Sequence, residues 1–223
     1  MKISPIVVEI LFAGALQAAD FWSLDGAAGK AAGEKDFVAA EAKYAEALEA
    51  AADPVQKTRA ILGKFEAMRG QKRVREAEEF LLSCVEAPDI RMQDARLLLN
   101  TLAGTMLWDR ADYAMALLQQ AQNCECLKAG NVYYQTFYLM AVLYRNREQY
   151  PAVIEVLENV LQVRDQHPAN LCKSHYMTGA AYEKLEMPEK ALAHYRTALE
   201  FGKQVKYKYN YSNVEKAIER MSK

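Results

Sequence analysis

Small and apolar residues recur along the chain at helical spacing, in five segments that follow one another about every 38 residues. The clearest segment has Gly179 and Tyr182, followed by Ala191, Tyr195 and Ala198. Polar residues occupy the positions between them, so each stretch predicts an amphipathic helix. Two helices in each period are typical of a solenoid. We therefore expect an all-α fold, a right-handed α-solenoid of about five helix-turn-helix units.

The other four segments repeat this pattern less clearly. We expect the repeat domain to cover residues 20–203, with units starting near residues 21, 58, 97, 134 and 172. Residues 204–223 would form a linker and a C-terminal capping helix. The pattern is carried by Ala28, Ala31, Ala40, Tyr44 and Ala47 in the first unit, Phe65, Met68, Ala77, Leu81 and Cys84 in the second, Gly104, Leu107, Ala116 and Gln120 in the third, and Ala141, Tyr144, Val153, Leu157 and Val160 in the fourth.

Residues with a strong preference for helix ends support these boundaries. Asp53 precedes Pro54 and ends a helix, because a residue before proline is pushed out of the helical region. Asn131 is expected to be an N-cap. Ser212 and Glu215 have the spacing of a capping box, which predicts that the last helix follows Ser212. A final helix with one polar face would end the stack without exposing its core.

The small and aromatic residues of the five segments resemble the pattern of the tetratricopeptide-repeat family. That family alternates a helix bearing a small residue and an aromatic with a helix bearing small, aromatic and small residues in turn. Gly179, Tyr182, Ala191, Tyr195 and Ala198 match this arrangement in the fifth unit, and residues 37–47 match its second helix in the first. The match is weaker in the middle of the chain, where the second unit has Phe65 in a small position and the third has Gln120 and Asn123 in an aromatic and a small position.

The resemblance implies that the first helix of each unit lines a concave face that holds a partner protein or peptide. The residues expected there belong to types enriched in interface hot spots, or can donate hydrogen bonds to a peptide. They are Arg59, Arg69, Thr105, Trp108, Gln135, Tyr138, Arg145, Asn146, Lys173 and Tyr176. The alternative is that Trp108 and Tyr138 pack between helices and that the arginines Arg69 and Arg145 lie on a solvated face.

The first 19 residues differ in character from the rest of the chain. Lys2 is followed by an apolar stretch and then by a run of small residues up to Ala19, which is the layout of a secretory signal peptide. Glu9 argues against this, because a carboxylate is costly inside the apolar stretch. We expect a bacterial protein located in the periplasm or secreted. The alternative is a cytoplasmic protein whose first residues form a helix packed on the first unit.

The composition and motifs of the chain exclude several classes of function but do not identify a binding partner. The formal net charge of −1 gives no basic excess for binding nucleic acid, and no apolar stretch is long enough for a transmembrane helix. No motif indicates an enzyme or a cofactor. We expect a non-enzymatic interaction module. The alternatives are a self-associating structural spacer of a cell-envelope assembly, or a metal- or substrate-binding enzyme centred on Cys172, His175 and His194. The simpler interpretation of His175 is a packing residue.

Overall fold

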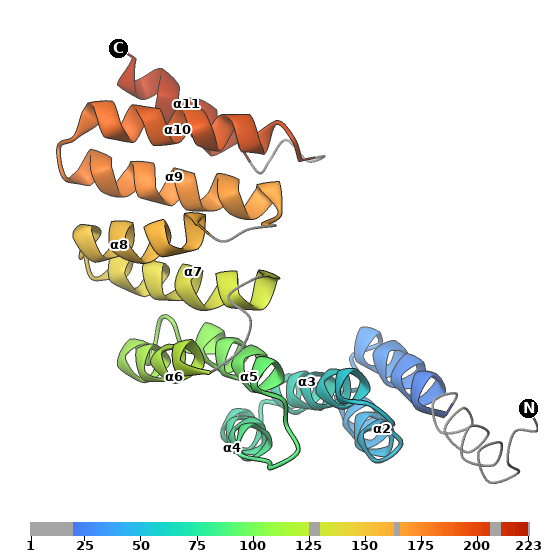
Figure 1. Ribbon diagram of the computed structural model, residues 1–223. Helices are drawn as coiled ribbons and strands as arrows, with labels where there is room; N and C mark the ends of the chain where they lie inside the picture. The colour runs from blue at the N-terminus through green and yellow to red at the C-terminus, as the bar shows by residue number, and fades with distance from the viewer. Residues whose placement is uncertain (1–19, 125–129, 163–165, 206–210, 223) are drawn as a thin grey trace, which may run out of the picture. The chain divides into compact units, whose positions relative to one another are not determined.

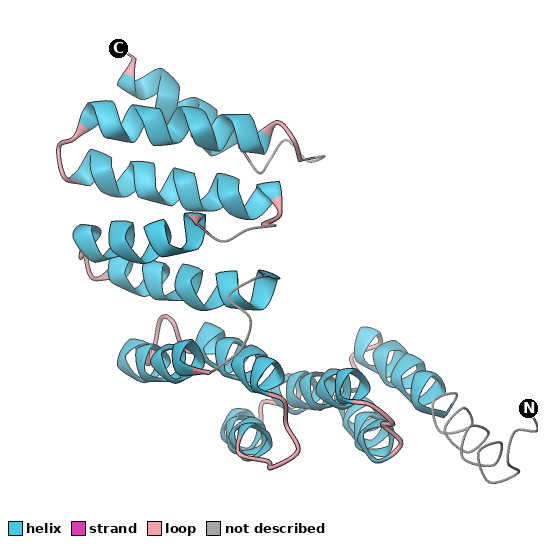
Figure 2. Cartoon of the chain, in the orientation of Figure 1, coloured by secondary structure: helices cyan, strands magenta, loops and turns pink. Residues whose placement is uncertain are grey.

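The computed structural model describes residues 20–124, 130–162, 166–205 and 211–222. Within these ranges the chain is almost entirely helical and contains no strand (Figure 2). The predicted signal peptide, residues 1–19, lies outside the described residues. The chain forms two compact units, one ending at Leu98 and the other beginning at Leu99. Each unit is described separately below.

The first unit consists of helices that pack in the order in which they follow along the chain (Figure 1). A helix over residues 20–33 precedes α2 (Phe37–Glu49), α3 (Pro54–Gly70) and α4 (Val74–Val85), and α5 (Met92–Thr105) begins within this unit. Phe21, Ala47 and Ala60 form one buried cluster. Ile61 and Phe65 of α3 are also buried.

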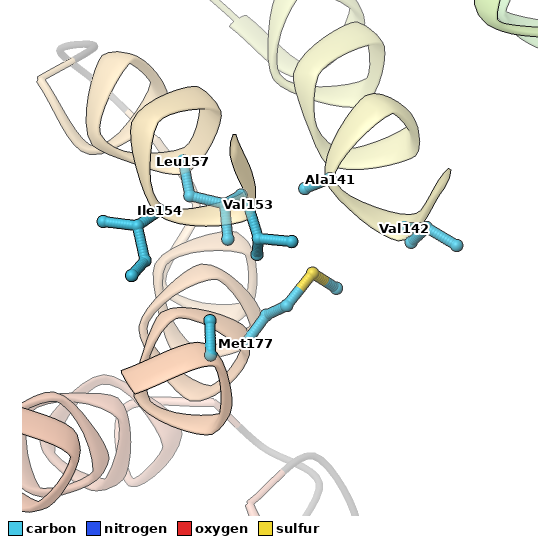
Figure 3. Close-up of a cluster of buried hydrophobic side chains, with 7 residues drawn as sticks. Ala141, Val142, Val153, Ile154, Leu157 and Met177 are labelled. Atoms are coloured by element: carbon cyan, nitrogen blue, oxygen red, sulfur yellow. The ribbon is translucent and has the colours of Figure 1, made fainter. Parts of the chain in front are cut away.

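In the second unit, too, helices that follow one another along the chain are neighbours. It contains α6 (Ala111–Asn123), α7 (Gly130–Asn146), α8 (Tyr150–Leu161), α9 (Pro168–Lys184), α10 (Pro188–Gly202) and α11 (Ser212–Met221). In Figure 1, α7 to α10 lie side by side from yellow to orange-red, and each packs on the next. Figure 3 shows part of the core between them, where Ala141 of α7 and Met177 of α9 meet Val153 and Leu157 of α8.

The helices keep the period found in the sequence. The first helices of successive pairs begin at Pro54, Met92, Gly130 and Pro168, so each begins 38 residues after the previous one. The described residues thus form five helix pairs, followed by α11. Within each unit, helices that follow one another along the chain cover one another's apolar faces, as α2 and α3 do in the first unit and α7 and α8 do in the second.

The second helix of the fifth pair carries buried residues four and three positions apart. They are Ala191, Tyr195 and Ala198 in α10, and all three are buried. On the facing helix α9, Gly179 allows the two backbones to approach, because a Cβ atom there would lie 2.8 Å from the Tyr195 ring and 3.1 Å from the Ala191 carbonyl oxygen. A small residue is therefore required at this crossing.

The prediction for the second helix of the third pair was wrong by two residues. Ala116, Gln120 and Asn123 are exposed, whereas Ala114, Leu118 and Ala121 are buried, together with Met115 and Leu117. Ala114, Leu118 and Ala121 keep the spacing of the other pairs, with leucine in the aromatic position. The third pair therefore follows the repeat in its second helix more closely than the sequence suggested.

Four of the five turns within pairs have the same backbone conformation. Lys35, Lys72, Glu148 and Glu186 each adopt a left-handed conformation, with φ between 58° and 64°. The N–H group of the following residue then bonds to a carbonyl five residues before it, as in Asp36 to Ala31. This bonding satisfies carbonyl groups at the end of the first helix.

The turn of the third pair is different. Helix α5 ends at Thr105 and α6 begins at Ala111, so the turn has five residues where the others have three. The Thr105 hydroxyl donates to the Leu102 carbonyl oxygen at 2.8 Å, and the Met106 N–H group bonds to Ala103. These bonds close the last turn of α5 early. Trp108 lies in the longer turn that results.

Two predicted helix caps were wrong. Asn131 lies inside α7, which already begins at Gly130, and its side-chain oxygen accepts a hydrogen bond of 2.9 Å from Asn170. Ser212 is the first residue of α11, and the capping position belongs to Tyr211, which makes no side-chain capping bond. Local capping patterns located both helices to within a residue or two, which is the usual uncertainty of a helix boundary.

Helix α11 covers the fifth pair, as a capping helix should. Val214 and Ala217 are buried against the cluster that contains Tyr195, and Ile218 packs at its edge. On the other side, Arg220 forms an ion pair with Glu183 of α9 at 2.7 Å. Glu183 also accepts a hydrogen bond of 2.7 Å from the Tyr195 hydroxyl. The last helix is thus attached by apolar contacts and by a small polar network.

Candidate functional site

A cavity of about 610 Å³ opens within the first unit, between the helix over residues 20–33, α2 and α3. Ligand-binding pockets in proteins commonly have a volume of this order. Its walls combine aromatic rings, small residues and four charged side chains. The lining residues are Asp25, Ala32, Phe37, Tyr44, Arg59, Leu62, Gly63, Glu66, Ala67, Arg69 and Gly70.

Two glycines of α3 allow aromatic rings of α2 to approach the backbone beside the cavity. A Cβ atom at Gly63 would lie 2.3 Å from the Tyr44 ring, and one at Gly70 would lie 2.5 Å from the Phe37 ring. Real side chains do not approach this closely, so any larger residue at either position would displace a ring. The chain from Gly63 to Gly70 spans about two helical turns, so the two rings meet α3 on the same side.

One charged pair in the cavity joins the first helix to α3. The Arg59 Nε atom donates to the Asp25 carboxylate at 2.8 Å, and Asp25 is almost fully buried. The Arg59 guanidinium also lies over the Trp22 ring, 5.6 Å from its centre. This side chain remains 58% exposed, so it can contact a ligand while holding the buried carboxylate. Burial and the Asp25 charge raise the pKa of Tyr44, which keeps its hydroxyl protonated.

The second charged pair lies further along α3. The Arg69 Nη1 atom contacts both carboxylate oxygens of Glu66 at 3.0 Å. The same guanidinium lies 5.5 Å from the centre of the Phe65 ring. The cavity thus presents two positive and two negative groups around an apolar interior. This arrangement suits a ligand with an apolar group flanked by polar ones, such as an extended peptide.

The structure places two of the ten predicted residues, Arg59 and Arg69, in this cavity. The sequence did not identify Asp25, Phe37 and Tyr44, which come from two other helices. Gly63 and Gly70, seven residues apart on α3, were the available signal, because paired glycines on one helix face indicate a close approach of another element.

Four predicted residues lie along α7, in the second unit. Tyr138 is half-buried, its ring centre lies 5.5 Å from that of Tyr134, and burial raises the pKa of its hydroxyl. Gln135 is also half-buried. Arg145 and Asn146 are exposed at the end of the helix, where Arg145 donates to the Asn146 side chain at 3.5 Å. Tyr138 therefore contributes to packing, and the two residues at the helix end are available to solvent.

On α9, which contacts α7, Lys173 is exposed and Tyr176 is half-buried against Tyr195, with 5.6 Å between ring centres. The remaining two predicted residues lie at the third turn. Thr105 closes α5, and Trp108 is 76% exposed. The alternative interpretation of Trp108 as a residue packed between helices is therefore wrong.

The three residues of the enzyme hypothesis do not form one site. His175 and His194 approach each other with 3.1 Å between their Nδ1 atoms. Cys172 is buried instead in a cluster with Val214 and Ala217 of α11. Across the described residues, no group of three or more histidine, cysteine, aspartate or glutamate side chains could hold a metal ion. His175 also stacks on Phe201, as expected for a packing residue.

Neither a family model nor a curated protein sequence matches this chain. Solved structures do match it over most of its length. The crystal structure of MamA protein has a TM-score of 0.56 and 19% identity, covering 84% of this chain and 94% of that one. BtubC (BKLC) from P. vanneervenii has a TM-score of 0.59 and 21% identity, covering 78% and 76% of the two chains.

A third solved structure decides the fold type. It is YrrB, described as a TPR protein with an unusual peptide-binding site, with a TM-score of 0.50 and 18% identity, covering 78% of this chain and 82% of that one. The chain has the tetratricopeptide-repeat fold. The fold predicted from the repeat is confirmed.

Within the tetratricopeptide-repeat fold, the cavity lies where two successive first helices face each other. Asp25 and Ala32 come from the first helix of the first pair, and Arg59 to Gly70 come from α3, the first helix of the second pair. Phe37 and Tyr44 of α2 complete the lining.

Among the described residues, no helix combines the length and the apolar character that crossing a bilayer requires.

Proposed function

We propose that the protein is a non-enzymatic interaction module that binds an extended segment of a partner protein in the cavity of its first unit. The observation that carries this proposal is the convergence of Asp25, Tyr44, Arg59 and Arg69 from three helices around one apolar space. Repeat proteins of this kind use side chains from successive units to build extended binding surfaces.

The composition of the cavity indicates what kind of segment it would hold. Phe37, Leu62 and Ala67 supply apolar surface for one side chain of the partner. Arg59, which is more than half exposed, can donate to a backbone carbonyl or a carboxylate beside it. Since the four charged groups of the cavity balance, we expect selectivity to depend on the apolar side chain and on hydrogen bonds rather than on the ligand's net charge.

A cavity-filling substitution tests this proposal without removing any polar contact. Ala32 lines the cavity, and Ala32→Trp would place an indole ring inside it. Ala27→Trp is the matched control, because Ala27 is exposed on the same helix. Peptides would be selected on the wild-type protein from a random displayed library, and their affinities measured by fluorescence anisotropy.

We expect Ala32→Trp to weaken the selected peptides by at least about tenfold, which corresponds to roughly 1.4 kcal/mol, and Ala27→Trp to leave them unchanged. Circular dichroism would verify that both variants remain folded. Equal affinity for wild type and Ala32→Trp would place the binding site elsewhere and would overturn the proposal.

A self-associating structural role is the second candidate, and the third turn favours it. Trp108 is 76% exposed and Tyr113, at the start of α6, is 42% exposed. Large aromatic side chains in solvent often mark a contact surface. Light scattering at rising protein concentration tests this role. A monomer at every concentration, with the same radius in Trp108→Ala, would eliminate it.

A further inference from the structure

Two histidines from neighbouring helices meet in the fifth pair. His175 lies on α9 and His194 on α10, with 3.1 Å between the Nδ1 atoms. Their ring centres are 5.2 Å apart, and the rings are tilted by 41°. Both side chains are half-buried. The cavity in the first unit does not involve them, so the proposed function gives no reason for their approach.

Surrounding aromatic rings hold both imidazoles in place. The His175 ring is stacked on Phe201 with 5.7 Å between centres and an angle of 11°. The His194 ring lies against Tyr182, with centres 5.4 Å apart. The two Nδ1 atoms are therefore directed at each other by packing on both sides. Ligands that are already positioned lose little conformational entropy when they bind a metal ion.

The protonation state of the pair also suits metal coordination. A hydrogen bond between two Nδ1 atoms requires one ring to donate its Nδ1 proton and the other to accept, so at least the accepting ring is neutral. The accepting Nδ1 atom therefore already presents a lone pair of the kind that a metal ion binds.

The distance between the two nitrogens matches the coordination geometry. Zinc–nitrogen distances of about 2.0–2.1 Å place two ligands of a tetrahedral ion about 3.3–3.4 Å apart. Two neighbouring ligands of a square-planar Cu²⁺ or Ni²⁺ ion would be about 2.9 Å apart at similar bond lengths. The observed 3.1 Å lies between these values. To bind one ion, both rings would have to turn so that their Nδ1 lone pairs converge beside the line that now joins them, and the distance between the two atoms would change by only a few tenths of an ångström.

We propose that His175 and His194 bind one divalent transition-metal ion through their Nδ1 atoms and so link α9 to α10. The ring that donates the shared proton would move that proton to its own Nε2 atom, so binding near neutral pH releases no proton overall. Water would complete the coordination, since the described residues bring no third histidine, cysteine or carboxylate side chain into a group with these two. Such a two-ligand site would favour ions with a strong preference for imidazole.

Titration of the full, untagged chain with NiCl₂ in a calorimeter tests this site. We expect one binding event in the wild type. His175→Ala and His194→Ala should each lower the Ni²⁺ affinity by more than about tenfold, because each removes a ligand, and even the loss of a group that only supports a ligand can lower metal affinity by that factor. His167→Ala is the matched control, because His167 is exposed and is the only other histidine. Its titration should match that of the wild type.

Binding that is the same in the wild type and in the double variant His175→Ala/His194→Ala would overturn the proposal and would assign the ion to other groups, such as thiols. Absence of wild-type binding would overturn it equally. Since either substitution could disturb α9 and α10, proton–nitrogen correlation NMR of the wild-type histidine rings with ZnCl₂ gives a second readout. We expect two of the three rings to shift at Nδ1. A shift confined to one ring, or to none, would contradict the site.

Discussion

Replacement of Gly179 by alanine tests whether close approach of two helix backbones holds each repeat together. Gly179 is buried on α9, where a Cβ atom would lie 2.8 Å from the Tyr195 ring and 3.1 Å from the Ala191 carbonyl oxygen. The Tyr195 ring has little freedom to move, because it is buried and its hydroxyl bonds to Glu183. The added methyl group must therefore push α9 and α10 apart.

Two opposing effects set the size of the change. Alanine is favoured over glycine inside a helix by about 1 kcal/mol. Overpacking a tight core costs about 1–3 kcal/mol, and contact with a fixed backbone atom puts Gly179 at the upper end of that range. The free energy of unfolding should therefore fall by about 1–2 kcal/mol. At Gly104, where no atom lies within 4 Å of an added Cβ, the same change should be neutral or slightly stabilising.

Urea denaturation followed by circular dichroism measures both variants, and both glycines belong to the second unit. We expect a lower transition midpoint for Gly179→Ala than for the wild type. The midpoint of Gly104→Ala should equal or exceed that of the wild type. In the double variant Gly179→Ala/Tyr195→Leu, the cost of the alanine should shrink, because the smaller side chain leaves room. If Gly179→Ala is as stable as wild type, backbone proximity does not determine the repeat packing.

Three further predictions address the charged, exposed and titrating groups. Arg59→Ala should reduce the stability of the first unit by about 1–3 kcal/mol, because it leaves the buried Asp25 carboxylate without its partner; Asp25→Asn in the same background should recover part of the loss in a urea titration. Trp108→Ala should change the free energy of unfolding by less than about 0.5 kcal/mol, because the ring is exposed; a larger loss would show that the ring packs in solution. The pKa of His175 is about 4 in the folded state and about 6.5 when unfolded, so the unfolded chain binds more protons between these pH values. The contribution of His175 to stability should therefore fall as the pH drops from 6.5 to 4. Thermal melts of His175→Phe should lack this part of the pH dependence, and those of His167→Ala should retain it.

Much of the fold could be predicted because every pair carries its pattern locally. The spacing of Ala191, Tyr195 and Ala198 alone indicates a helix with one small-large-small face. The third pair was misread because the repeat was aligned two residues too late, which put the polar residues Gln120 and Asn123 in positions that Leu118 and Ala121 occupy. The early end of α5 was not predicted, although the Thr105 hydroxyl that bonds to Leu102 lies at that end.

The candidate site was only partly predictable for a related reason. Arg59 and Arg69 could be chosen from their positions on one helix, but Asp25 and Tyr44 come from different helices. Which residues of separate helices meet depends on the distance between the helices, and Gly63 and Gly70 permit the close approach of α2 to α3. Sequence periodicity shows which face of a helix is buried, but how closely two helices approach each other is seen only in the structure.

Mapping a bound peptide onto the chain tests the central claim most directly. Amide shifts would be recorded by proton–nitrogen NMR while a library-selected peptide is added to the wild-type protein. The proposal predicts that the largest changes surround Asp25, Tyr44 and Arg59, and that they vanish in Ala32→Trp. Changes confined to the second unit, for example around Tyr176, would show that the partner binds elsewhere and would contradict the proposed site.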